Sequence, residues 1–593
     1  MFKSTVTFFL SAILLGGFGN VMADAHDAAL LAPERGSGYS AKPGWTAKKF
    51  MVVAANPLAV DAGYQMLKKG GSAIDAAIAT QMVLTLVEPQ SSGIGGGAFL
   101  LHFDGKTVKA FDGRETAPAA ATETLFLNAD GKPMPFFDAV VGGRSVGVPG
   151  VLRMLELAHL RYGKLPWSTL FVPAIRLATN GFAVSPRLAM LLQDEPYLKK
   201  DPAAAAYFYD REGRPRPTGY LLKNPALAKT LKNIADNGAD AFYKGQIARD
   251  IVNKVAHHST NPGSLSVADL AGYRAKVREP VCSDYRVWTV CGMPPPSSGG
   301  IAVAQMLGIL ENRNMRALVP TADGLSAEAV HLFVEAGRLA YADRNRYIAD
   351  TDFVPLPGNS FAPLLDKPYL AQRAALIGER SMKHAQAGIP RDWQIAWGTD
   401  ASPELPSTSH MSIVDKKGNA VAMTTTIENA FGSRQMVDGF LLNNELTDFS
   451  AIAVDENGPV ANRVQPGKRP RSSMAPTFVF DKRADKLLLV IGSPGGSSII
   501  NYVAKVLVGT LDWGLDMQQA IDLPNIGSRN GPTELEQGRV SSTLVDALKA
   551  RGHDVVLDEQ TSGLHGVMRS RMNGGDVWFG GADPRREGIA KGD

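Results

Sequence analysis

The sequence predicts an α+β or layered α/β protein in which both halves of the chain build one core. Helical patterns dominate roughly the first two thirds of the chain. Strand patterns with Gly and Pro turns follow from residue 408 onward, and strand pairs occur in both parts. The change of pattern near residue 408 therefore need not mark a boundary between domains.

The composition is that of a globular protein that can bury a large core. Of 593 residues, 45% are hydrophobic and 20% are charged, and the mean hydropathy is close to zero. The formal net charge is only +4 and no Lys/Arg run stands out, which makes nucleic acid a poor candidate partner. The 10 histidines show no metal-ligand spacing, so we do not expect a metal enzyme.

The N-terminus is typical of an export signal. A short positive start precedes an apolar stretch from Val6 to Leu15, and small residues around Ala23 offer cleavage sites. The apolar stretch is too short to span a bilayer, and no later stretch approaches the roughly 18 apolar residues that a span needs. We therefore predict a signal peptide over residues 1–25, no stable membrane anchor, and a periplasmic or secreted protein.

The expected elements follow in order along the chain. Between Asn56-Pro57 and Gly70-Gly71 the start and stop signals of a helix are clear. Helices are expected over residues 58–69, 72–89, from 149 to about 258, 302–311 and 327–349. Strands are expected within 91–118 after a glycine-rich loop, and over 410–415, 420–427, 477–481, 486–496, 566–572 and 575–583. The mostly polar segment 398–407 is expected to be an exposed loop.

Cys282 and Cys291 flank eight residues that can fold as a short hairpin with the two thiols opposite each other. In an oxidising compartment this arrangement suits a disulfide, and two buried thiols are the alternative. No His or Asn lies near either cysteine in the sequence, so neither is a candidate nucleophile.

Two glycine-rich motifs invite comparison with known catalytic loops. Residues 143–147 match the G-x-S-x-G pattern around Ser145, which would make the protein a serine hydrolase. Pro149 is the natural first residue of the following helix, so a Gly-rich strand-to-helix turn is the alternative. The motif GSPGGSS at 492–498 follows an apolar strand and lacks a Lys, which favours an anion-binding nest of backbone N–H groups over a nucleotide loop.

The stretch from Ser407 to Gly432 predicts a hairpin whose ends carry hydroxyls that a hairpin does not need. Thr408 heads one strand, and residues 424–426, all Thr, end its partner. A threonine hydroxyl is a weak nucleophile unless a base lies beside it, and a threonine at the head of a chain has its own α-amine, with a pKa of about 8. Breaking the Ser407–Thr408 bond would supply that amine. The high β-propensity of threonine is the alternative explanation.

This stretch resembles the signature of the γ-glutamyltransferases, members of the N-terminal nucleophile hydrolase superfamily. The matching residues are Thr408, Ser409, His410, Ser412, Gly418, Asn419, Val421, Thr424, Thr426, Glu428, Phe431 and Gly432. Further motifs follow in the family's order: FDGRETAP at 111–118, PPPSSGG at 294–300, LLNNELTDFS at 441–450, KRPRSSMAPT at 468–477 and GSPGGSS at 492–498. The resemblance spans about residues 45–585.

The resemblance implies a four-layer αββα sandwich that two autoproteolytic fragments build jointly. Self-cleavage at Ser407–Thr408 would give a large subunit of residues 26–407 and a small subunit of residues 408–593, which form one structural domain. Thr408 would be the catalytic nucleophile, Thr426 would orient it, and the N–H groups of Gly495 and Gly496 would form the oxyanion hole. No cofactor is implied.

The resemblance also implies a γ-glutamyl pocket. Arg114, with Ser472 and Ser473, would bind the α-carboxylate of the donor. The acceptors for its α-ammonium would be Glu428, Glu445 and Asp448. The expected activity is that of an exported γ-glutamyltransferase and glutathione hydrolase. The γ-glutamyl group of glutathione or a glutamine-like donor would pass to Thr408 and then to water or to an amino-acid or dipeptide acceptor.

Three features depart from the family pattern. Glu428 and Glu445 stand where some members carry amides, residues 450–467 contain no aromatic residue to latch a lid, and Arg471 replaces an apolar residue. The nearest alternative is a cephalosporin or glutaryl acylase on the same scaffold, which needs no ammonium acceptors. A periplasmic solute-binding protein is the alternative of another class.

Overall fold

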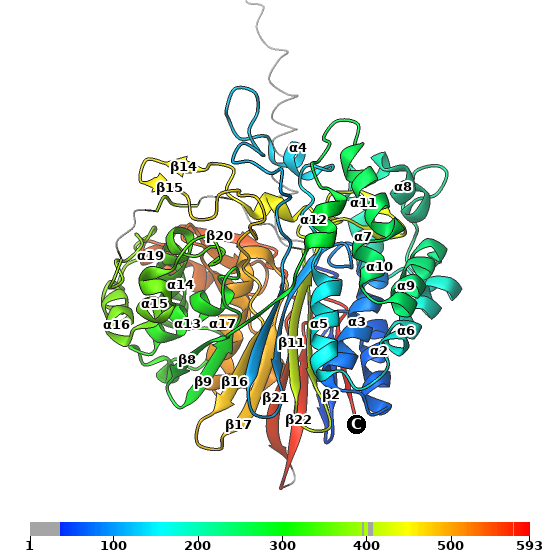
Figure 1. Cartoon of the computed structure of the whole chain (residues 1–593). Coiled ribbons are helices and arrows are strands. Elements are labelled where there is room, and N and C mark those ends of the chain that lie inside the picture. Colours follow the sequence, from blue (N-terminus) through cyan, green and yellow to red (C-terminus); the bar gives the residue numbers. More distant parts are fainter. Residues whose placement is uncertain (1–35, 394–396, 401, 403–406, 573) are drawn as a thin grey trace, which may run out of the picture.

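Two seven-stranded sheets lie face to face, and helices cover the outer face of each sheet (Figure 1). The structure, a computed structural model of the uncleaved chain, describes residues 36–393, 397–400, 402, 407–572 and 574–593. The layers therefore run helix, sheet, sheet, helix, and the predicted four-layer αββα sandwich is confirmed.

Sheet 1 carries the hairpin that begins beside Thr408. Its order is β23-β2-β10-β11-β3-β4-β7, and every neighbouring pair is antiparallel. In that order its strands are Ile589–Gly592, Met51–Ala54, Ser409–Val414, Ala420–Thr426, Gly97–Phe103, Val108–Gly113 and Lys276–Arg278. Strands from before and after residue 408 are neighbours in it, so neither part of the chain could form this sheet alone.

Sheet 2 is also antiparallel throughout and is mixed in the same way. Its order is β1-β22-β21-β17-β16-β9-β8. In that order its strands are Trp45–Ala47, Gly575–Ala582, His565–Met572, Lys486–Gly492, Thr477–Asp481, Trp288–Gly292 and Val281–Tyr285. The edge hairpin β8-β9 places Cys282 opposite Cys291, and the two are joined in a disulfide, which decides between the two alternatives that the sequence left open.

Alternation along the strands of sheet 1 separates two hydrophobic cores. Met411 and Ile413 of β10 pack in the core under one helical layer, whereas Val414 packs in the core that sheet 1 shares with sheet 2. The helices of the first layer include α2 (Pro57–Lys68), α3 (Ala73–Val87), α5 (Val151–Tyr162) and α6 (Trp167–Asn180). Those of the second layer include α13 (Gly299–Leu310), α14 (Ala327–Tyr347) and α17 (Ile499–Leu511).

Shorter elements complete the described chain. The remaining α-helices are α4 (Phe136–Val140), α7 (Pro186–Gln193), α8 (Pro202–Phe208), α9 (Pro225–Asn237), α10 (Asp240–Tyr243), α11 (Gln246–Ala256), α12 (Val267–Gly272), α15 (Ala362–Leu365), α16 (Lys367–Ala375), α18 (Met517–Asp522) and α19 (Ser542–Ala550). The remaining strands are β5 (Phe182–Ala183), β6 (Leu221–Leu222), β12 (Met436–Val437), β13 (Phe440–Leu441), β14 (Val454–Asp455), β15 (Gly458–Pro459), β18 (Ile526–Gly527), β19 (Thr533–Glu536) and β20 (Val555–Asp558).

The helices α17, α18 and α19 were not expected in the part after residue 408. Every residue of α17 is buried, although its sequence has an amphipathic pattern like that of a surface helix. The short strands β1 and β2, which precede the first predicted helix, were also missed.

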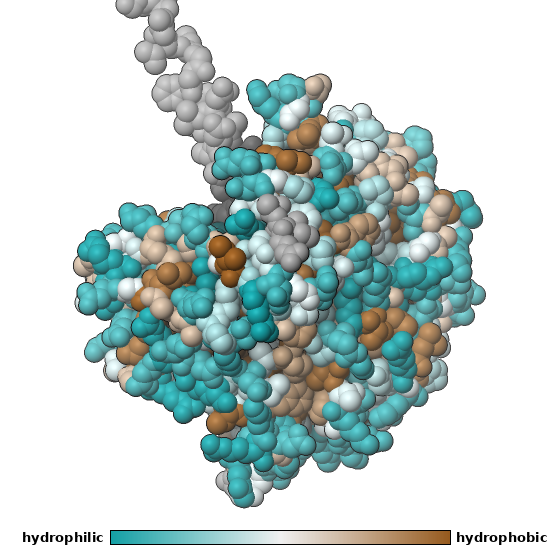
Figure 2. Space-filling view, turned by 60° about the vertical axis from the view of Figure 1, so that its left-hand side comes forward, coloured by the Kyte–Doolittle hydropathy of each residue, from teal (hydrophilic) through white to brown (hydrophobic). Residues whose placement is uncertain are grey.

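None of the helices in the described part of the chain has the length and apolar character that a membrane span needs. The face of the molecule in Figure 2 is mainly hydrophilic, with hydrophobic groups scattered over it. The predicted signal peptide, residues 1–25, lies outside the described residues.

Candidate active site

The hairpin β10-β11 brings Thr408 opposite Thr426. Its register pairs Ser409 with Thr425, so the residues one step further out, Thr408 and Thr426, lie across from each other at the same end of the two strands. At the other end, Asp415 accepts hydrogen bonds from the backbone of Lys417 and of Asn419 and fixes the turn. The strand lengths therefore set where the two threonines meet.

Thr426 contacts both sides of the Ser407–Thr408 peptide bond. Its hydroxyl donates to the carbonyl oxygen of Ser407 at 2.7 Å, and the hydroxyl of Thr408 donates to it at 3.4 Å. The backbone N–H of Glu428 also donates to it, at 2.8 Å. All four residues are buried. The peptide bond before Thr408 thus has a nearby nucleophile and a hydrogen-bond donor on its carbonyl oxygen.

A buried histidine holds the two strands in register beneath this site. The Nδ1 atom of His410 lies 2.8 Å from the hydroxyl of Thr424, and its Nε2 atom lies 3.1 Å from the hydroxyl of Ser412. Burial, followed by the neighbouring His565, holds the pKa of His410 well below its ordinary value. The contacts of His410 with Ser412 and Thr424 in the core therefore explain why these three residues belong to the family signature.

Arg114 lies at the centre of a buried ion cluster. Its guanidinium pairs with Glu445 and, at 2.5 Å, with Asp448. It also donates to the backbone carbonyls of Pro470 at 3.1 Å and Arg471 at 2.8 Å. The residue expected to bind a carboxylate is thus paired with two of the three residues expected to bind an ammonium.

Two further carboxyl groups next to Arg114 favour the protonated form. Burial, and then the charges of Asp448 and Glu445, raise the pKa of Glu428 well above its ordinary value. Burial, and then Glu445, raise the pKa of Glu115 in the same way. The sequence reasoning did not single out Glu115, although it follows Arg114 directly. Its wholly buried side chain is the signal that only the structure provides.

Ser472 and Ser473 lie on the segment that leads into β16. The hydroxyl of Ser473 accepts from Nη2 of Arg344 at 2.6 Å, and the hydroxyl of Ser472 accepts from the backbone N–H of Met474 at 3.2 Å. The carbonyl of Ser472 accepts from both the N–H and the hydroxyl of Ser298 at 2.7 Å. The motif PPPSSGG therefore positions this serine pair.

The predicted oxyanion loop turns sharply between β17 and α17. Gly495 and Gly496 have φ angles of 136° and 54°, a region that favours glycine. A Cβ atom on Gly495 would lie 2.5 Å from the ring of Tyr502, so the site excludes any side chain. Gly496 then opens a 3₁₀ turn, η5 (Gly496–Ser498), that leads into α17.

One small cavity gathers the predicted residues. It is lined by Arg114, Thr408, Thr426, Glu428, Glu445, Asp448, Ser472, Ser473, Met474, Gly496 and Ile499. Every predicted catalytic and substrate-binding residue except Gly495 is among them. The cavity has a volume of only ≈20 Å³, close to the space needed for a single water molecule. In the uncleaved chain this cavity has no space for a glutamyl group.

Within the segment 398–407, expected to be an exposed loop, residues 401 and 403–406 lie outside the described residues, and most of the others are buried. Gly398, Asp400 and Ser407 are buried, whereas Thr399 is exposed. Asp400 pairs with Arg471 at 2.9 Å, and both side chains are almost completely buried. This ion pair explains the departure at position 471, because Arg471 neutralises a buried carboxylate.

The region expected to hold a lid forms the small hairpin β14-β15. Its Pro459 carbonyl accepts from the N–H of Gly398 at 3.0 Å, and Asp455 accepts from the N–H of Thr399 at 2.8 Å. Asn462 donates both to Asp400 at 2.8 Å and to the carbonyl of Asp448 at 2.7 Å. The hairpin region thus connects the pre-cleavage segment to the ion cluster.

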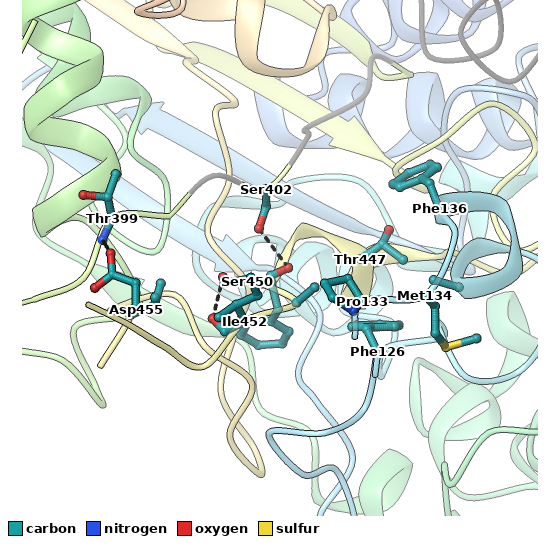
Figure 3. A pocket seen from close by; sticks show the side chains of 14 residues that line it. Phe126, Pro133, Met134, Phe136, Thr399, Ser402, Thr447, Ser450, Ile452 and Asp455 are labelled. Carbon is teal, nitrogen blue, oxygen red and sulfur yellow. Dashed lines mark hydrogen bonds between the residues drawn. The ribbon is translucent and has the colours of Figure 1, made fainter. Parts of the chain in front are cut away.

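An apolar cavity of ≈460 Å³ lies beside this hairpin (Figure 3). Phe126, Met134 and Phe136 lie on one side and Thr399 and Asp455 on the other, with Ile452 between them. The aromatic side chains of this cavity come mainly from residues before position 408, since residues 450–467 contain none.

Ser145 is not a nucleophile. Its buried hydroxyl donates to the carbonyl of Val140 at 2.6 Å, and α5 begins only at Val151. A nucleophile elbow would expose the serine at the start of a helix. The glycine-rich turn is therefore the correct interpretation of this motif.

A histidine pair distant in sequence forms a hydrogen-bond chain. Nε2 of His331 donates to the carbonyl of Gly378 at 2.9 Å, and its Nδ1 lies 2.8 Å from Nε2 of His553. Nδ1 of His553 in turn lies 2.7 Å from the hydroxyl of Thr533. These histidines and Glu335 bring one potential metal-ligand atom each within 4.8 Å, a grouping that the sequence did not reveal.

Comparison with known proteins finds relatives that match almost the whole chain. The family model described as gamma-glutamyltranspeptidase matches residues 59–593. The glutathione hydrolase proenzymes of Bacillus subtilis (strain 168) and Escherichia coli (strain K12) are 38% and 39% identical over 554 residues, which cover 89% and 91% of this chain and 91% of each relative. The solved structure of cephalosporin acylase from Bacillus halodurans is 29% identical with a TM-score of 0.79, and the match covers 93% of this chain and 97% of that chain.

Proposed function

The chain belongs to the γ-glutamyltranspeptidase family, and from this premise we propose that Thr408 cuts its own chain and then serves as the catalytic nucleophile. The protein is an enzyme of the γ-glutamyltranspeptidase and glutathione hydrolase type. The observation that carries the proposal for Thr408 is the hydrogen bond from Thr426 to the carbonyl oxygen of Ser407.

In the proposed self-cleavage, the hydroxyl oxygen of Thr408 attacks the carbonyl carbon of Ser407. The Thr426 hydroxyl stabilises the negative charge that develops on the carbonyl oxygen. The C–N bond then breaks, the nitrogen takes up the proton of the hydroxyl, and an ester joins Ser407 to Thr408. Water hydrolyses this ester and leaves fragments 26–407 and 408–593, with the new α-amine of Thr408 as the base for later turnovers.

The ion cluster suits a donor that carries both charges of an amino acid. A donor α-carboxylate can replace Asp448 and Glu445 at Arg114, with Ser472 and Ser473 as further hydrogen-bond donors. The released carboxylates, with Glu428, then accept the α-ammonium. The positive charge of that ammonium also lowers the cost of ionising Glu428. A zwitterion therefore exchanges existing ion pairs for new ones and leaves no buried charge alone.

The proposed reaction transfers the γ-glutamyl group in two steps. Thr408 attacks the γ-amide carbonyl of glutathione or a related donor, and its α-amine takes the proton and passes it to the leaving amine, for instance cysteinylglycine. The N–H groups of Gly495 and Gly496 bind the oxyanion, where one such donor lowers the barrier by about 3 kcal/mol. Water or an amino-acid or dipeptide acceptor then releases the γ-glutamyl group.

A cephalosporin or glutaryl acylase shares this scaffold, as the structural likeness to a cephalosporin acylase illustrates. A glutaryl group has no ammonium, so binding it would leave the carboxylates around Arg114 without a new partner. We therefore assign the γ-glutamyl reaction to this site. The alternative of a solute-binding protein is wrong, since the chain belongs to an enzyme family.

We also propose that the enzyme is exported through its N-terminal signal and acts in the periplasm or outside the cell. The disulfide between Cys282 and Cys291 agrees with an oxidising compartment. Cell fractionation with mass spectrometry tests this proposal: full-length protein retained in the cytoplasm would contradict it.

One preparation tests the main proposal. Purified wild type should run as two bands, and Edman sequencing of the smaller should give Thr-Ser-His-Met-Ser, while Thr408→Ala remains a single intact band. The cleaved enzyme should turn over glutathione much faster than a glutaryl amide. An intact wild-type chain that still hydrolyses a γ-glutamyl anilide would refute the role of Thr408, and the reverse substrate preference would refute the pocket assignment.

A further inference from the structure

A buried arginine on the last turn of α14 contacts the serine pair that is expected to bind the α-carboxylate of the donor. The Nη2 atom of Arg344 donates to the hydroxyl of Ser473 at 2.6 Å, and its Nε atom donates to the hydroxyl of Ser298 at 2.9 Å. All three residues are buried. The helix α14 lies outside the motifs that carry the family resemblance, and the reaction described above gives Arg344 no role.

The main chain of the serine pair is held by the PPPSSGG motif. The N–H of Ser298 donates to the carbonyl of Ser472 at 2.7 Å, and the hydroxyl of Ser297 donates to the carbonyl of Met474 at 2.6 Å. These contacts fix the backbone on both sides of Ser473. They do not set the direction of its side-chain hydroxyl.

The contact with Arg344 sets that direction. A guanidinium carries only hydrogen-bond donors, so the oxygen of Ser473 accepts from Nη2 and its own proton points away from Arg344. Ser473 also lines the small cavity around Thr408. A carboxylate bound there carries only acceptors and needs this proton, and a hydroxyl that accepts from a cation is a stronger donor. The hydroxyl of Ser473 therefore suits a position between the guanidinium and a carboxylate of the substrate.

The same guanidinium reaches Ser472 through Ser298. The Ser298 hydroxyl accepts from Nε of Arg344 and donates to the carbonyl of Ser472 at 2.7 Å. One planar group therefore holds both serines of the pair, Ser473 directly and Ser472 through its carbonyl. A lysine has a single ammonium on a flexible stem and cannot reproduce this fixed pair of contacts.

We propose that Arg344 is a positioning residue for the α-carboxylate of the donor: it orients the hydroxyl of Ser473 as a hydrogen-bond donor and holds Ser472 through Ser298. This inference rests on the proposed function, because it assumes that the serine pair binds a γ-glutamyl donor. Arg114 remains the cation that pairs with the carboxylate, and Arg344 acts only through the two serines.

Two anilides separate this role from a contribution to stability alone. A γ-glutamyl anilide carries the α-carboxylate, and 4-aminobutyryl anilide has a hydrogen atom in its place. Arg344→Met should lower kcat/KM for the γ-glutamyl anilide by about tenfold, mainly through a higher KM, because the hydrogen bond from Ser473 to a charged group is weakened. For the 4-aminobutyryl anilide the loss should be about twofold or less. Equal losses on the two anilides would overturn the proposal.

A double-variant cycle on the γ-glutamyl anilide tests whether Arg344 acts through Ser473. Ser473→Ala removes the hydroxyl that Arg344 orients. In that background Arg344→Met should lower kcat/KM by a clearly smaller factor than it does in the wild-type background. The same factor in both backgrounds would also overturn the proposal.

A conservative variant and a control on the same helix complete the test. Arg344→Lys keeps the positive charge and should restore part of the lost kcat/KM. If Arg344→Met gives too little cleaved enzyme, Arg344→Lys decides, since its loss should again be larger on the γ-glutamyl anilide. Arg346→Met should leave both anilides near the wild-type rate, because Arg346 is partly exposed and lies over the ring of Tyr347. Failure of wild type to use any γ-glutamyl donor would instead refute the proposed function.

Discussion

The hydroxyl of Thr426 donates to the carbonyl oxygen of Ser407 at 2.7 Å, directly across the hairpin from the hydroxyl of Thr408. This places a proton donor where negative charge develops when Thr408 attacks. Thr426→Val keeps the shape but removes the donor, so self-cleavage should slow by about 100-fold or more. A time course of the two bands on a gel measures this rate, and Thr426→Ser is the control that retains the hydroxyl. Cleavage of Thr426→Val at the wild-type rate would contradict the role of Thr426.

The carboxylate of Asp448 should select for donors with an α-ammonium. Asp448→Asn removes one charged acceptor and should raise KM for glutathione by about tenfold or more. For a glutaryl anilide, which has no ammonium, the same substitution should change KM less. Steady-state kinetics on the two substrates measure the difference, with the surface variant Asp240→Asn as a control. Equal losses on both substrates would mean that Asp448 only supports the structure.

The buried pair of Asp400 and Arg471 predicts a non-additive effect on stability. Removing Arg471 leaves the carboxylate of Asp400 buried without its ion-pair partner, and this typically costs about 3–5 kcal/mol. Arg471→Leu and Asp400→Asn should each lower the free energy of unfolding, whereas the double variant should recover much of the loss. Urea unfolding of all four proteins, in a Thr408→Ala background that keeps the chain intact, completes the cycle. Additive losses would show that the two residues act independently.

The histidine chain predicts a loss of stability in mild acid. Burial, followed by the charge of Arg338, lowers the pKa of His553 to about 4, below an unfolded value of about 6.5. Between these values the unfolded chain binds a proton that the folded chain does not. The contribution of His553 is therefore fully present above pH 6.5 and is lost as the pH falls toward 4.

Urea unfolding at pH 7 and pH 5 measures this effect. His553→Gln should reduce the difference in unfolding free energy between the two pH values, whereas His257→Gln, at an exposed position, should leave it as in wild type. An unchanged difference in His553→Gln would exclude this chain as an acid-sensitive element. The reference protein and both histidine variants should carry the additional substitution Thr408→Ala, so that the chain stays intact and unfolding involves one chain.

Local patterns were sufficient to predict the hairpin that carries Thr408. Its alternating apolar residues and its Lys-Gly-Asn turn define both strands, and a similar argument indicated the hairpin of Cys282 and Cys291 but left their disulfide open. Sequence motifs also identified residues that lie together around one cavity, although they come from segments hundreds of positions apart. The grouping of these distant residues came from the family resemblance, because no spacing rule links Arg114 to Thr408.

Features that depend on distant contacts escaped prediction. Asp400 was expected in an exposed loop, since its partner Arg471 lies on a different part of the chain. Glu115 gave no signal because its unusual property is complete burial beside Glu445. In each case the tertiary surroundings, and not the local residues, determine the outcome.

The strands of the two proposed fragments are neighbours in both sheets, and under the proposed self-cleavage this has a consequence for how the enzyme is made. Before the cut, folding is a reaction of a single molecule and does not depend on concentration. After the proposed cut, we expect the fragments to stay associated through their shared sheet hydrogen bonds and cores, but recovery from complete unfolding would require two chains to meet. The folded, cleaved enzyme should therefore remain intact at very low protein concentration. After complete unfolding in denaturant, however, it should refold poorly at low protein concentration, because its two fragments must first meet.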